Sequence, residues 1–359
     1  MTTARPSRRT AAPQDVTAAQ AAALLERALF EVKKVVVGQD RMIERMLVAL
    51  LSRGHCLIEG VPGVAKSLAV ETLARVVGVS WVRLQFTPDL VPSDLVGTRV
   101  YRPSTESFDV ELGPVFANLV LADEINRAPA KVQSALLEVM AEGHVSIGGV
   151  TYPVPKPFLV LATQNPIESE GVYPLPEAQR DRFLMKIVVD HPSLSEEMEI
   201  VRRMAVDPPQ AEEVLDLQEL VSLQRAVDGV FAHHAVAEYA VRLVMATREP
   251  QAWGLPALQP LVAHGASPRG SLGLVRGARA LALLRGRDYV LPADVADLAV
   301  DVLAHRLVLT YEALADEVPA GRVVEQVLEA IEPPQVAPSQ MGGGSTQVTP
   351  TSSAPEGAA

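Results

Sequence analysis

The sequence contains only one cysteine in 359 residues, which excludes an internal disulfide and a thiolate metal cluster. Cys56 itself stands in an apolar run, where a small buried residue is expected. No apolar run approaches the roughly 18 residues that a membrane-spanning helix needs. The N-terminus carries Arg8 and Arg9, but the polar residues Gln14 and Asp15 soon follow, so an export signal is not expected. These absences favour a cytoplasmic protein without a membrane span.

Positive charge is also scarce. The chain has 32 Lys and Arg residues against 43 Asp and Glu, a formal net charge of −11, and its clearest basic cluster lies in the N-terminal tail. Because proteins that bind nucleic acid usually present a broad basic surface, nucleic acid is not an expected partner. Apolar residues make up 48% of the chain and charged residues 21%, as in an ordinary globular protein whose length allows two domains.

The two ends of the chain differ in composition from the rest. Residues 1–16 are rich in Ala, Pro, Thr and Arg, and residues 334–359 in Pro, Gly, Ser and Thr, so we expect both tails to be disordered. Residues 17–190 alternate apolar strand-like runs with helical patterns, which predicts a mostly parallel sheet covered by helices. The predicted strands are Cys56–Ile58, Trp81–Leu84, Leu119–Ala122, Phe158–Ala162 and Leu184–Val189.

Residues 191–333 show apolar repeats of helical spacing only. The pattern therefore predicts a separate domain made of helices alone, whose charged faces are solvated surfaces. The repeats run through Leu215–Val227, Val236–Ala246, Leu272–Leu284 and Val295–Leu303.

Two insertions in the α/β part have the pattern of β-hairpins. The first runs from Val100–Arg102 to Phe108–Leu112, where apolar residues alternate with acidic ones. In the second, His144–Tyr152, Gly148 and Gly149 form a two-residue turn between alternating segments. Such hairpins are either moving parts that contact a partner or local packing, and the sequence leaves both open.

The most informative segment follows the first predicted strand. A loop containing glycine ends in Lys66 and Ser67 and opens an amphipathic helix. Such a loop points backbone N–H groups inward, the lysine adds a point charge and the helix N-terminus adds its dipole, so a polyphosphate fits. We expect a nucleoside triphosphate with Mg²⁺ here. The residues expected to hold it are Gly60, Val61, Pro62, Gly63, Val64, Ala65, Lys66, Ser67 and Leu68.

Ala65 stands where a loop of this kind usually has glycine. A methyl group is tolerated there if the backbone has a negative φ, while Gly60 and Gly63 still serve the tight turn. The phosphate site itself is expected with alanine at this position. The alternative for the whole segment is a turn without a ligand.

Two adjacent carboxylates, Asp123 and Glu124, close the buried strand Leu119–Ala122. The carboxyl ends of parallel strands meet at the edge where ligands bind, so this pair is expected beside the phosphate loop. We expect Asp123 to hold Mg²⁺ together with Ser67, and Glu124 to activate the attacking water. The alternative is a solvated strand end.

Three further residues match roles in phosphoryl transfer. Asn165 follows the next strand, where its amide could bind the γ-phosphate and the water, although Asn before Pro is also a common turn. The guanidinium of Arg182 suits charge on a transferring phosphoryl group and could come from a neighbouring subunit; an ion pair with Asp181 is the alternative. Arg269 follows Ser267 at a helix start and could reach phosphate from above, or it belongs to a capping motif alone.

Together these motifs resemble the MoxR family of AAA+ ATPases, from about residue 20 to residue 332. The resemblance implies an α/β fold: an AAA+ P-loop NTPase core over residues 17–190 with a parallel five-stranded sheet of order 5-1-4-3-2, and a C-terminal α-helical lid over residues 191–333. Alanine before the P-loop lysine is itself usual in that family. The motifs that carry the resemblance are Gly60–Ser67, Gln85–Leu90, Asp123–Lys131, Ala162–Glu168 and Tyr173–Gln179.

The resemblance also implies residue roles. Gly38 and Gln39 match the family's adenine-side segment, so their backbone is expected to lie against the base. The two insertions match the helix-2 insert and the pre-sensor-1 hairpin. The catalytic set would be Lys66 and Ser67 as Walker A, Asp123 and Glu124 as Walker B, Asn165 as sensor 1, Arg182 as arginine finger and Arg269 as sensor 2.

For the whole protein, the resemblance implies binding of ATP and Mg²⁺ and a ring of identical subunits, usually hexameric, with nucleotide sites between subunits. It implies chaperone-like remodelling of proteins, often with a partner that carries a von Willebrand factor A domain. The substrate protein does not follow from these residues. This sequence departs from the family after Arg269, where Gly270, Gly273 and Gly277 each cost a helix up to about 1 kcal/mol. We therefore expect that helix to be less rigid.

Other functions remain as alternatives. A ring helicase is one, since related AAA+ motors with the same two insertions move DNA, but these usually place Lys or Arg at the pre-sensor hairpin tip, where this chain has Ile147–Val150. A scaffold that binds nucleotide without hydrolysis is another, although every catalytic position holds a competent residue. A GTPase or a small-molecule kinase is less favoured, because the chain has no Asn-Lys-x-Asp motif and no evident second-substrate pocket.

Overall fold

The computed structural model describes residues 16–166 and 171–335, and its centre is a five-stranded parallel sheet. The strands stand in the order β2, β5, β8, β1, β9, which is the predicted order 5-1-4-3-2 read from the other edge. Their bounds are β1 Cys56–Gly60, β2 Trp81–Gln85, β5 Leu119–Asp123, β8 Leu159–Gln164 and β9 Met185–Val189. Residues 1–15 and 336–359, which make up nearly all of the two predicted tails, and residues 167–170 lie outside the described residues.

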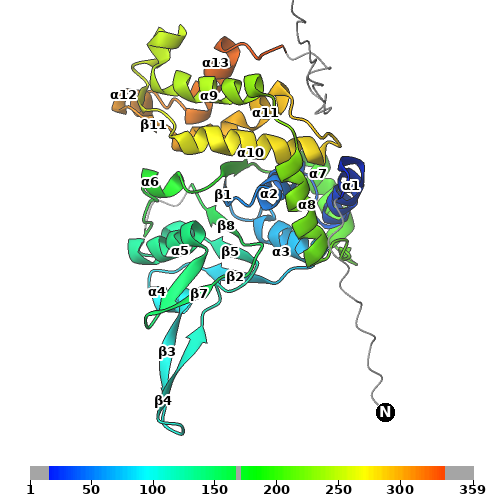
Figure 1. The fold of residues 1–359 in the computed structure, drawn as a ribbon, viewed down its shortest axis with the longest axis vertical. Helices are drawn as coiled ribbons and strands as arrows, with labels where there is room; N and C mark the ends of the chain where they lie inside the picture. Colours follow the sequence, from blue (N-terminus) through cyan, green and yellow to red (C-terminus); the bar gives the residue numbers. More distant parts are fainter. Residues whose placement is uncertain (1–15, 167–170, 336–359) are drawn as a thin grey trace, which may run out of the picture.

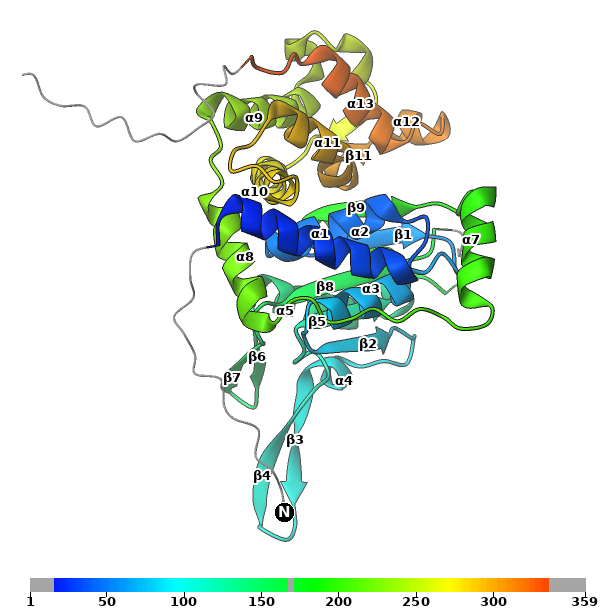
Figure 2. The ribbon, with the colours of Figure 1, turned by 90° about the vertical axis from the view of Figure 1, so that its right-hand side faces the viewer.

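The alternation of side chains along the strands divides the core into two layers. On β5, Leu119 and Leu121 pack into the core on one face of the sheet, while Val120 and Ala122 pack into the core on the other. The first core is formed with α1 (Ala18–Val35), α2 (Asp40–Leu51) and α3 (Lys66–Val76), the second with α5 (Ala130–Glu142). Figures 1 and 2 show these helices on the two faces of the sheet. This is the burial on both faces that continuous apolar strands predict.

Both predicted hairpins are present. β3 (Gly97–Arg102) pairs with β4 (Ser107–Leu112), following the short helix α4 (Pro92–Val96), and projects far from the body of the molecule (Figure 1). β6 (His144–Ile147) pairs with β7 (Val150–Pro153). Gly148 and Gly149 between them have φ of 59° and 85°, which a two-residue hairpin turn requires.

The region after residue 190 is mostly helical, but the expectation of helices alone is wrong. A two-stranded antiparallel sheet joins β10 (Val262–His264) to β11 (Val308–Leu309). These strands have three and two residues, too few for a period of two to be recognised in the sequence. The helices there are α7 Leu194–Met204, α8 Leu217–Gly229, α9 His234–Arg248, α10 Pro268–Leu284, α11 Pro292–Leu303, α12 Tyr311–Ala315 and α13 Ala320–Ala330.

The first two of these helices lie against the α/β core. Gln224 on α8 donates a 2.6 Å hydrogen bond to Leu50 O at the end of α2, and Arg53 forms an ion pair with Asp228. Figure 2 shows α7 across the end of the sheet to which β1 and β9 point. The predicted boundary at residue 190 stays a prediction, since α8 contacts both parts. The short helix α6 (Glu177–Arg180) and the 3₁₀ helices Ile125–Arg127, Pro250–Trp253, Pro256–Leu258 and Ala304–Arg306 complete the described elements.

Close packing around α10 accounts for its three glycines, Gly270, Gly273 and Gly277. Helix α10 is continuous across them, and a Cβ at Gly277 would lie 2.9 Å from Leu298 Cδ1, while one at Gly273 would lie 3.1 Å from Val302 Cγ1. The glycines therefore allow α10 to approach α11 closely. Within the described part of the chain, no helix is long and apolar enough to cross a membrane.

Candidate nucleotide site

The phosphate loop joins β1 to α3, and its first residue packs tightly against β9. Gly60 pairs with Val189 of β9, and a Cβ at Gly60 would lie 2.5 Å from Val189 O, so only glycine fits. Gly63 has φ of +87° with open space beside it. The first backbone N–H groups of α3 have no helical acceptor, and they add partial positive charge where the loop ends.

The backbone of Ala65 does not meet the condition of a negative φ. Its φ is +61° and its ψ is 20°, so it lies in the left-handed region rather than at a negative φ. A residue with a Cβ pays of order 1 kcal/mol or more there. Since α3 begins at Lys66, the strained residue is the one that turns the chain into the helix.

A cavity of about 330 Å³ opens at the carboxyl ends of β1, β5 and β8. Lys66 Nζ enters it and donates to Gly60 O. Burial lowers the pKa of Lys66, and the charges of Asp123, Glu124 and Glu59 oppose that effect. The lining residues are Pro62, Gly63, Ala65, Lys66, Ser67, Leu68, Arg83, Asp123, Glu124, Thr163 and Asn165.

Asp123 is the last residue of β5 and is only 8% exposed. Its Oδ1 accepts a hydrogen bond from Thr163 Oγ1, and its Oδ2 lies 3.4 Å from Ser67 Oγ. A hydroxyl and a carboxylate oxygen so close together are donors that Mg²⁺ prefers, with waters completing its shell. Ser67 and Asp123 therefore fit the predicted metal.

Glu124 follows the strand with φ of 56° and ψ of 49°, which turns its side chain away from the line of β5. Its N–H donates to Thr163 Oγ1 at 2.9 Å. Its Oε2 accepts from Gln85 Nε2 at 2.8 Å and lies 3.0 Å from Arg127 Nε. The carboxylate is thus held by donors from two sides at the cavity wall.

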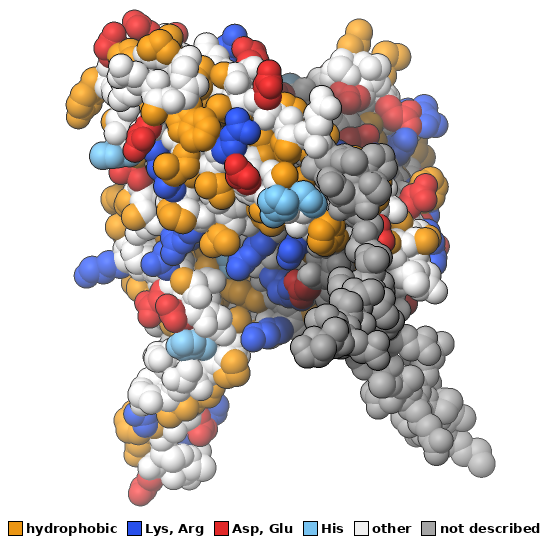
Figure 3. Space-filling model, turned by 45° about the horizontal axis from the view of Figure 1, so that its top comes forward, with side chains coloured by type: hydrophobic (Ala, Val, Ile, Leu, Met, Phe, Trp, Pro, Cys, Tyr) orange, Lys and Arg blue, Asp and Glu red, His pale blue; other side chains and the backbone are white. Residues whose placement is uncertain are grey.

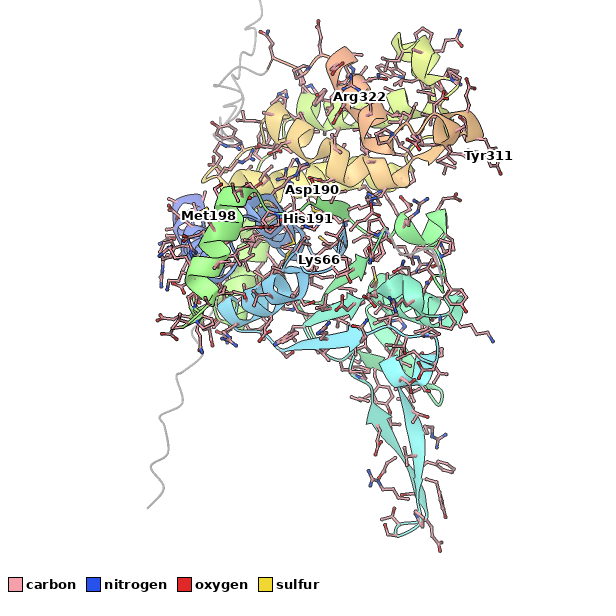
Figure 4. All side chains as sticks on the ribbon, turned by 180° about the vertical axis from the view of Figure 1, so that it is seen from behind. Lys66, Asp190, His191, Met198, Tyr311 and Arg322 are labelled. Atoms are coloured by element: carbon pink, nitrogen blue, oxygen red, sulfur yellow. The ribbon has the colours of Figure 1, made fainter. Side chains whose placement is uncertain are left out.

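Asn165 lies in the same cavity, directly after β8, and is 6% exposed. Gly38 and Gln39 lie beside the carboxyl end of β9: Gln39 Nε2 donates to Asp190 O at 3.2 Å, and a Cβ at Gly38 would meet the side chain of Glu196. Figure 4 shows Asp190 and His191 near Lys66. The predicted adenine-side segment therefore flanks the phosphate loop without lining the 330 Å³ cavity.

Arg182 and Arg269 do not line this cavity. They line a second one, of about 340 Å³, together with Arg53, Arg276 and Arg306. Arg182 donates to Leu137 O at 2.7 Å, so the alternative of an ion pair with Asp181 is not what the structure shows. Figure 3 shows Lys and Arg side chains across the middle of the molecule.

Arg269 combines both sequence interpretations. Its N–H donates to the N-cap Ser267, as a capping motif predicts, while its side chain lies 3.4 Å from Asp181 Oδ2. Arg269 does not line the phosphate cavity of its own chain, and its role toward bound phosphate stays a prediction. The segment before β9, to which Asp181 belongs, holds it at the amino end of that strand.

Sequence reasoning gave no role to two residues that line the phosphate cavity, Arg83 and Thr163, or to Gln85, which contacts Glu124. Arg83 and Gln85 lie on the same side of β2 and contact Asp123 and Glu124, and Thr163 bridges the two acids. The rule that strand carboxyl ends meet at the ligand edge applied to β2 as well as to β5 and β8. Applied to the predicted strand Trp81–Leu84, it would have drawn attention to Arg83 and to Gln85, which directly follows that strand.

Comparison with known proteins agrees with the geometry. Residues 55–185 match the family model described as "ATPase family associated with various cellular activities (AAA)", and residues 257–327 match the "AAA lid domain". The chain is 64% identical over 312 residues to "Chaperone MoxR1" of Mycobacterium tuberculosis, covering 87% of this chain and 83% of that protein. It is 36% identical over 310 residues to "Protein MoxR" of Methylorubrum extorquens, covering 80% and 88%.

A solved structure from Cytophaga hutchinsonii has the same fold. It superposes with a TM-score of 0.84 and is 44% identical in sequence, over 89% of this chain and 97% of that one. The likeness extends through both the sheet and the helical part, since so little of either chain is left out.

Proposed function

Because the chain belongs to the MoxR family of AAA+ ATPases, we propose that it hydrolyses ATP with Mg²⁺ at sites shared between neighbouring copies in a hexameric ring. The family itself is a chaperone-type ATPase family by the names of its members. The dependence on Mg²⁺, the ring and the remodelling of partner proteins are the parts proposed here.

The observation that supports a shared site is the separation of the arginines from the phosphate loop. Cys56 and Met185 are partners in parallel strands, so Arg182 lies before the amino end of β9 while Lys66 follows the carboxyl end of β1. Five-residue strands span roughly 15 Å. Arg182 or Arg269 can therefore reach the phosphate cavity only if a second copy brings its amino-end face to the carboxyl-end face of the first.

Each residue then has a chemical role. Lys66 and the N-terminus of α3 bind the phosphates, and Ser67 and Asp123 would hold Mg²⁺, which when bound neutralises charge on the phosphate oxygens. Glu124 accepts a proton as a water oxygen bonds to the γ-phosphorus and the bond to the bridging oxygen breaks, giving ADP and phosphate. Asn165 orients the water, and Arg182 and Arg269 of the adjacent copy stabilise the charge that develops.

We propose that the product of this cycle is motion applied to a protein, through a partner with a von Willebrand factor A domain. Tyr101 and Phe108 on the projecting hairpin β3–β4 are 49% and 59% exposed, which gives that hairpin an apolar contact surface. The tip of β6–β7, residues 147–150, carries no Lys or Arg, so the helicase alternative gains no support. The cytoplasmic location stays a prediction.

The test uses Glu124→Gln in the full chain. We expect it to bind ATP as the wild type does in the presence of Mg²⁺ and to lose turnover by at least about 100-fold, because the amide cannot take a proton. Glu71→Gln, on the exposed side of α3, is the matched control and should keep full activity. Undiminished hydrolysis by Glu124→Gln would remove Glu124 from its role.

Proteins captured by this variant with ATP would identify the partner class, and recovery of single-stranded DNA alone would favour the helicase.

A further inference from the structure

The carboxylate of Asp123 already holds a cation from its own chain. Arg83 donates to Asp123 Oδ2 from Nη2 at 2.6 Å and from Nε at 3.0 Å. Ser67 Oγ lies 3.4 Å from the same oxygen, and Thr163 occupies Oδ1. The guanidinium therefore lies at the oxygen that, with Ser67, is proposed to serve Mg²⁺.

A carboxylate oxygen cannot serve both partners fully. Two N–H donors on Oδ2 use the lone pairs that a magnesium ion, or a water bound to it, would need. Arg83 also supplies a full positive charge in direct contact with Asp123, so it neutralises this largely buried carboxylate. Arg83 and the metal are thus alternatives at one oxygen.

The two partners differ in freedom to move. The side chain of Asp123 is 11% exposed, whereas that of Arg83 is 52% exposed and stands on β2, the edge strand of the sheet. Arg83 can therefore leave without disturbing the core. It lines the same cavity as Lys66, so after leaving Asp123 it faces the space where the phosphates bind.

We propose that Arg83 is a positioning residue that occupies Asp123 in the absence of magnesium nucleotide and exchanges with the metal when nucleotide binds. The inference rests on the proposed function, because it concerns the metal of that site. The exchange keeps Asp123 neutralised in both states and transfers the arginine charge to the phosphate side. Binding of Mg²⁺ then carries the cost of displacing Arg83.

The experiment measures nucleotide binding rather than turnover. A fluorescent ADP is titrated with the full chain at a series of Mg²⁺ concentrations, with EDTA as the baseline. Arg83→Met should lower the Mg²⁺ concentration that gives half-maximal tightening by about tenfold, since a charge-assisted pair no longer has to be broken. Arg83→Lys keeps the positive charge but loses the paired guanidinium N–H donors, so its Mg²⁺ midpoint should lie between those of the wild type and Arg83→Met. This variant tests the prediction if Arg83→Met fails to fold. Arg75→Met, which removes an exposed arginine on α3, is the control and should match the wild type.

A second measurement separates this inference from the proposed function. Mn²⁺ binding without nucleotide, followed by water proton relaxation, should be about tenfold tighter in Arg83→Met than in the wild type. If the wild type binds nucleotide and both midpoints are unchanged in the variant, the exchange is refuted and the proposed function stands. A higher Mg²⁺ midpoint in the variant would show that Arg83 supports the metal and does not compete with it. If the wild type binds no nucleotide, the proposed function fails, and the Mn²⁺ comparison alone decides whether Arg83 competes.

Discussion

Asp181 Oδ1 accepts a 3.0 Å hydrogen bond from Nε of Arg306, whose side chain is only 2% exposed. This pair joins the segment before β9 to the helical part, because Asp181 also accepts from Ser267 at the N-cap of α10. Burial lowers the pKa of Arg306 to about 10, and the charge of Asp181 opposes that effect. One carboxylate thus neutralises a buried cation and fixes the start of the helix that carries Arg269.

Replacing Asp181 by alanine should therefore be costly. We expect Asp181→Ala to lower the free energy of unfolding by about 3 to 5 kcal/mol, since it leaves a buried guanidinium without its counter-ion. Asp228→Ala is the control, because its partner Arg53 is 46% exposed, and it should cost less than about 1 kcal/mol. Denaturant unfolding of both variants measures the two free energies. Equal losses of stability in Asp181→Ala and Asp228→Ala would refute the special role of the buried pair.

The glycines of α10 give a second prediction. Gly277→Ala gains helix propensity but forces a Cβ to within 2.9 Å of Leu298 Cδ1, so we expect a net destabilisation of about 1 kcal/mol or more. In α13, a Cβ at Gly321 would meet Val300 Cγ1 at an ordinary 3.5 Å, so Gly321→Ala should stabilise by up to about 1 kcal/mol. Melting temperatures that move in opposite directions support close packing of α10. A stabilised Gly277→Ala would argue that the glycine is only a weak helix former.

The third prediction concerns the loss of folding stability at acidic pH. His55 is buried, and burial lowers its pKa from 6.5 to about 4. The folded chain keeps His55 neutral, whereas the unfolded chain binds a proton below pH 6.5. Stability is therefore unaffected by this group above pH 6.5 and falls as the pH drops from 6.5 toward 4, by roughly 3 kcal/mol at most. Unfolding between pH 7 and 4.5, with the His55 pKa measured by NMR, tests this; a pKa near 6.5 in the folded protein would contradict it.

Much of the fold followed from local pattern. The apolar run Leu119–Ala122 is a strand because it is buried on both faces, and its position before Asp123 and Glu124 placed both acids at the phosphate loop. The strand order came from the family resemblance rather than from the periodicity. What pattern could not show was geometry that depends on distant contacts, such as the left-handed backbone at Ala65.

The position of Arg182 and Arg269 is the clearest example of geometry that the sequence pattern could not show. Nothing near Arg269 in sequence tells which end of the sheet it faces, because that depends on how α10 packs against α11, which in turn contacts β9. Arg83 escaped notice for a similar reason: its partner Asp123 is 40 residues away. Strand pairing, with Arg83 opposite Leu121, brings it beside the acid.

The separation of Arg182 from Lys66 leads to the last prediction. Arg182→Ala and Glu124→Gln should each be inactive alone, but mixing them should restore activity, because an Arg182→Ala copy can use the arginine of a Glu124→Gln neighbour. Random mixing of equal amounts in a closed ring completes about a quarter of the sites.

Two control mixtures identify the faces. Lys66→Ala with Glu124→Gln removes residues from the same cavity, and Arg182→Ala with Arg269→Ala removes residues from the same opposite face, so neither mixture should complete a site. The activity of the wild type per subunit should rise with protein concentration as copies assemble. Restoration in a control mixture would contradict the assignment of its two residues to the same face. Failure of the Arg182→Ala and Glu124→Gln mixture to regain activity, or constant activity per subunit across the assembly range, would place all the catalytic residues in one chain. The roughly 15 Å between the two ends of the sheet argues against that outcome.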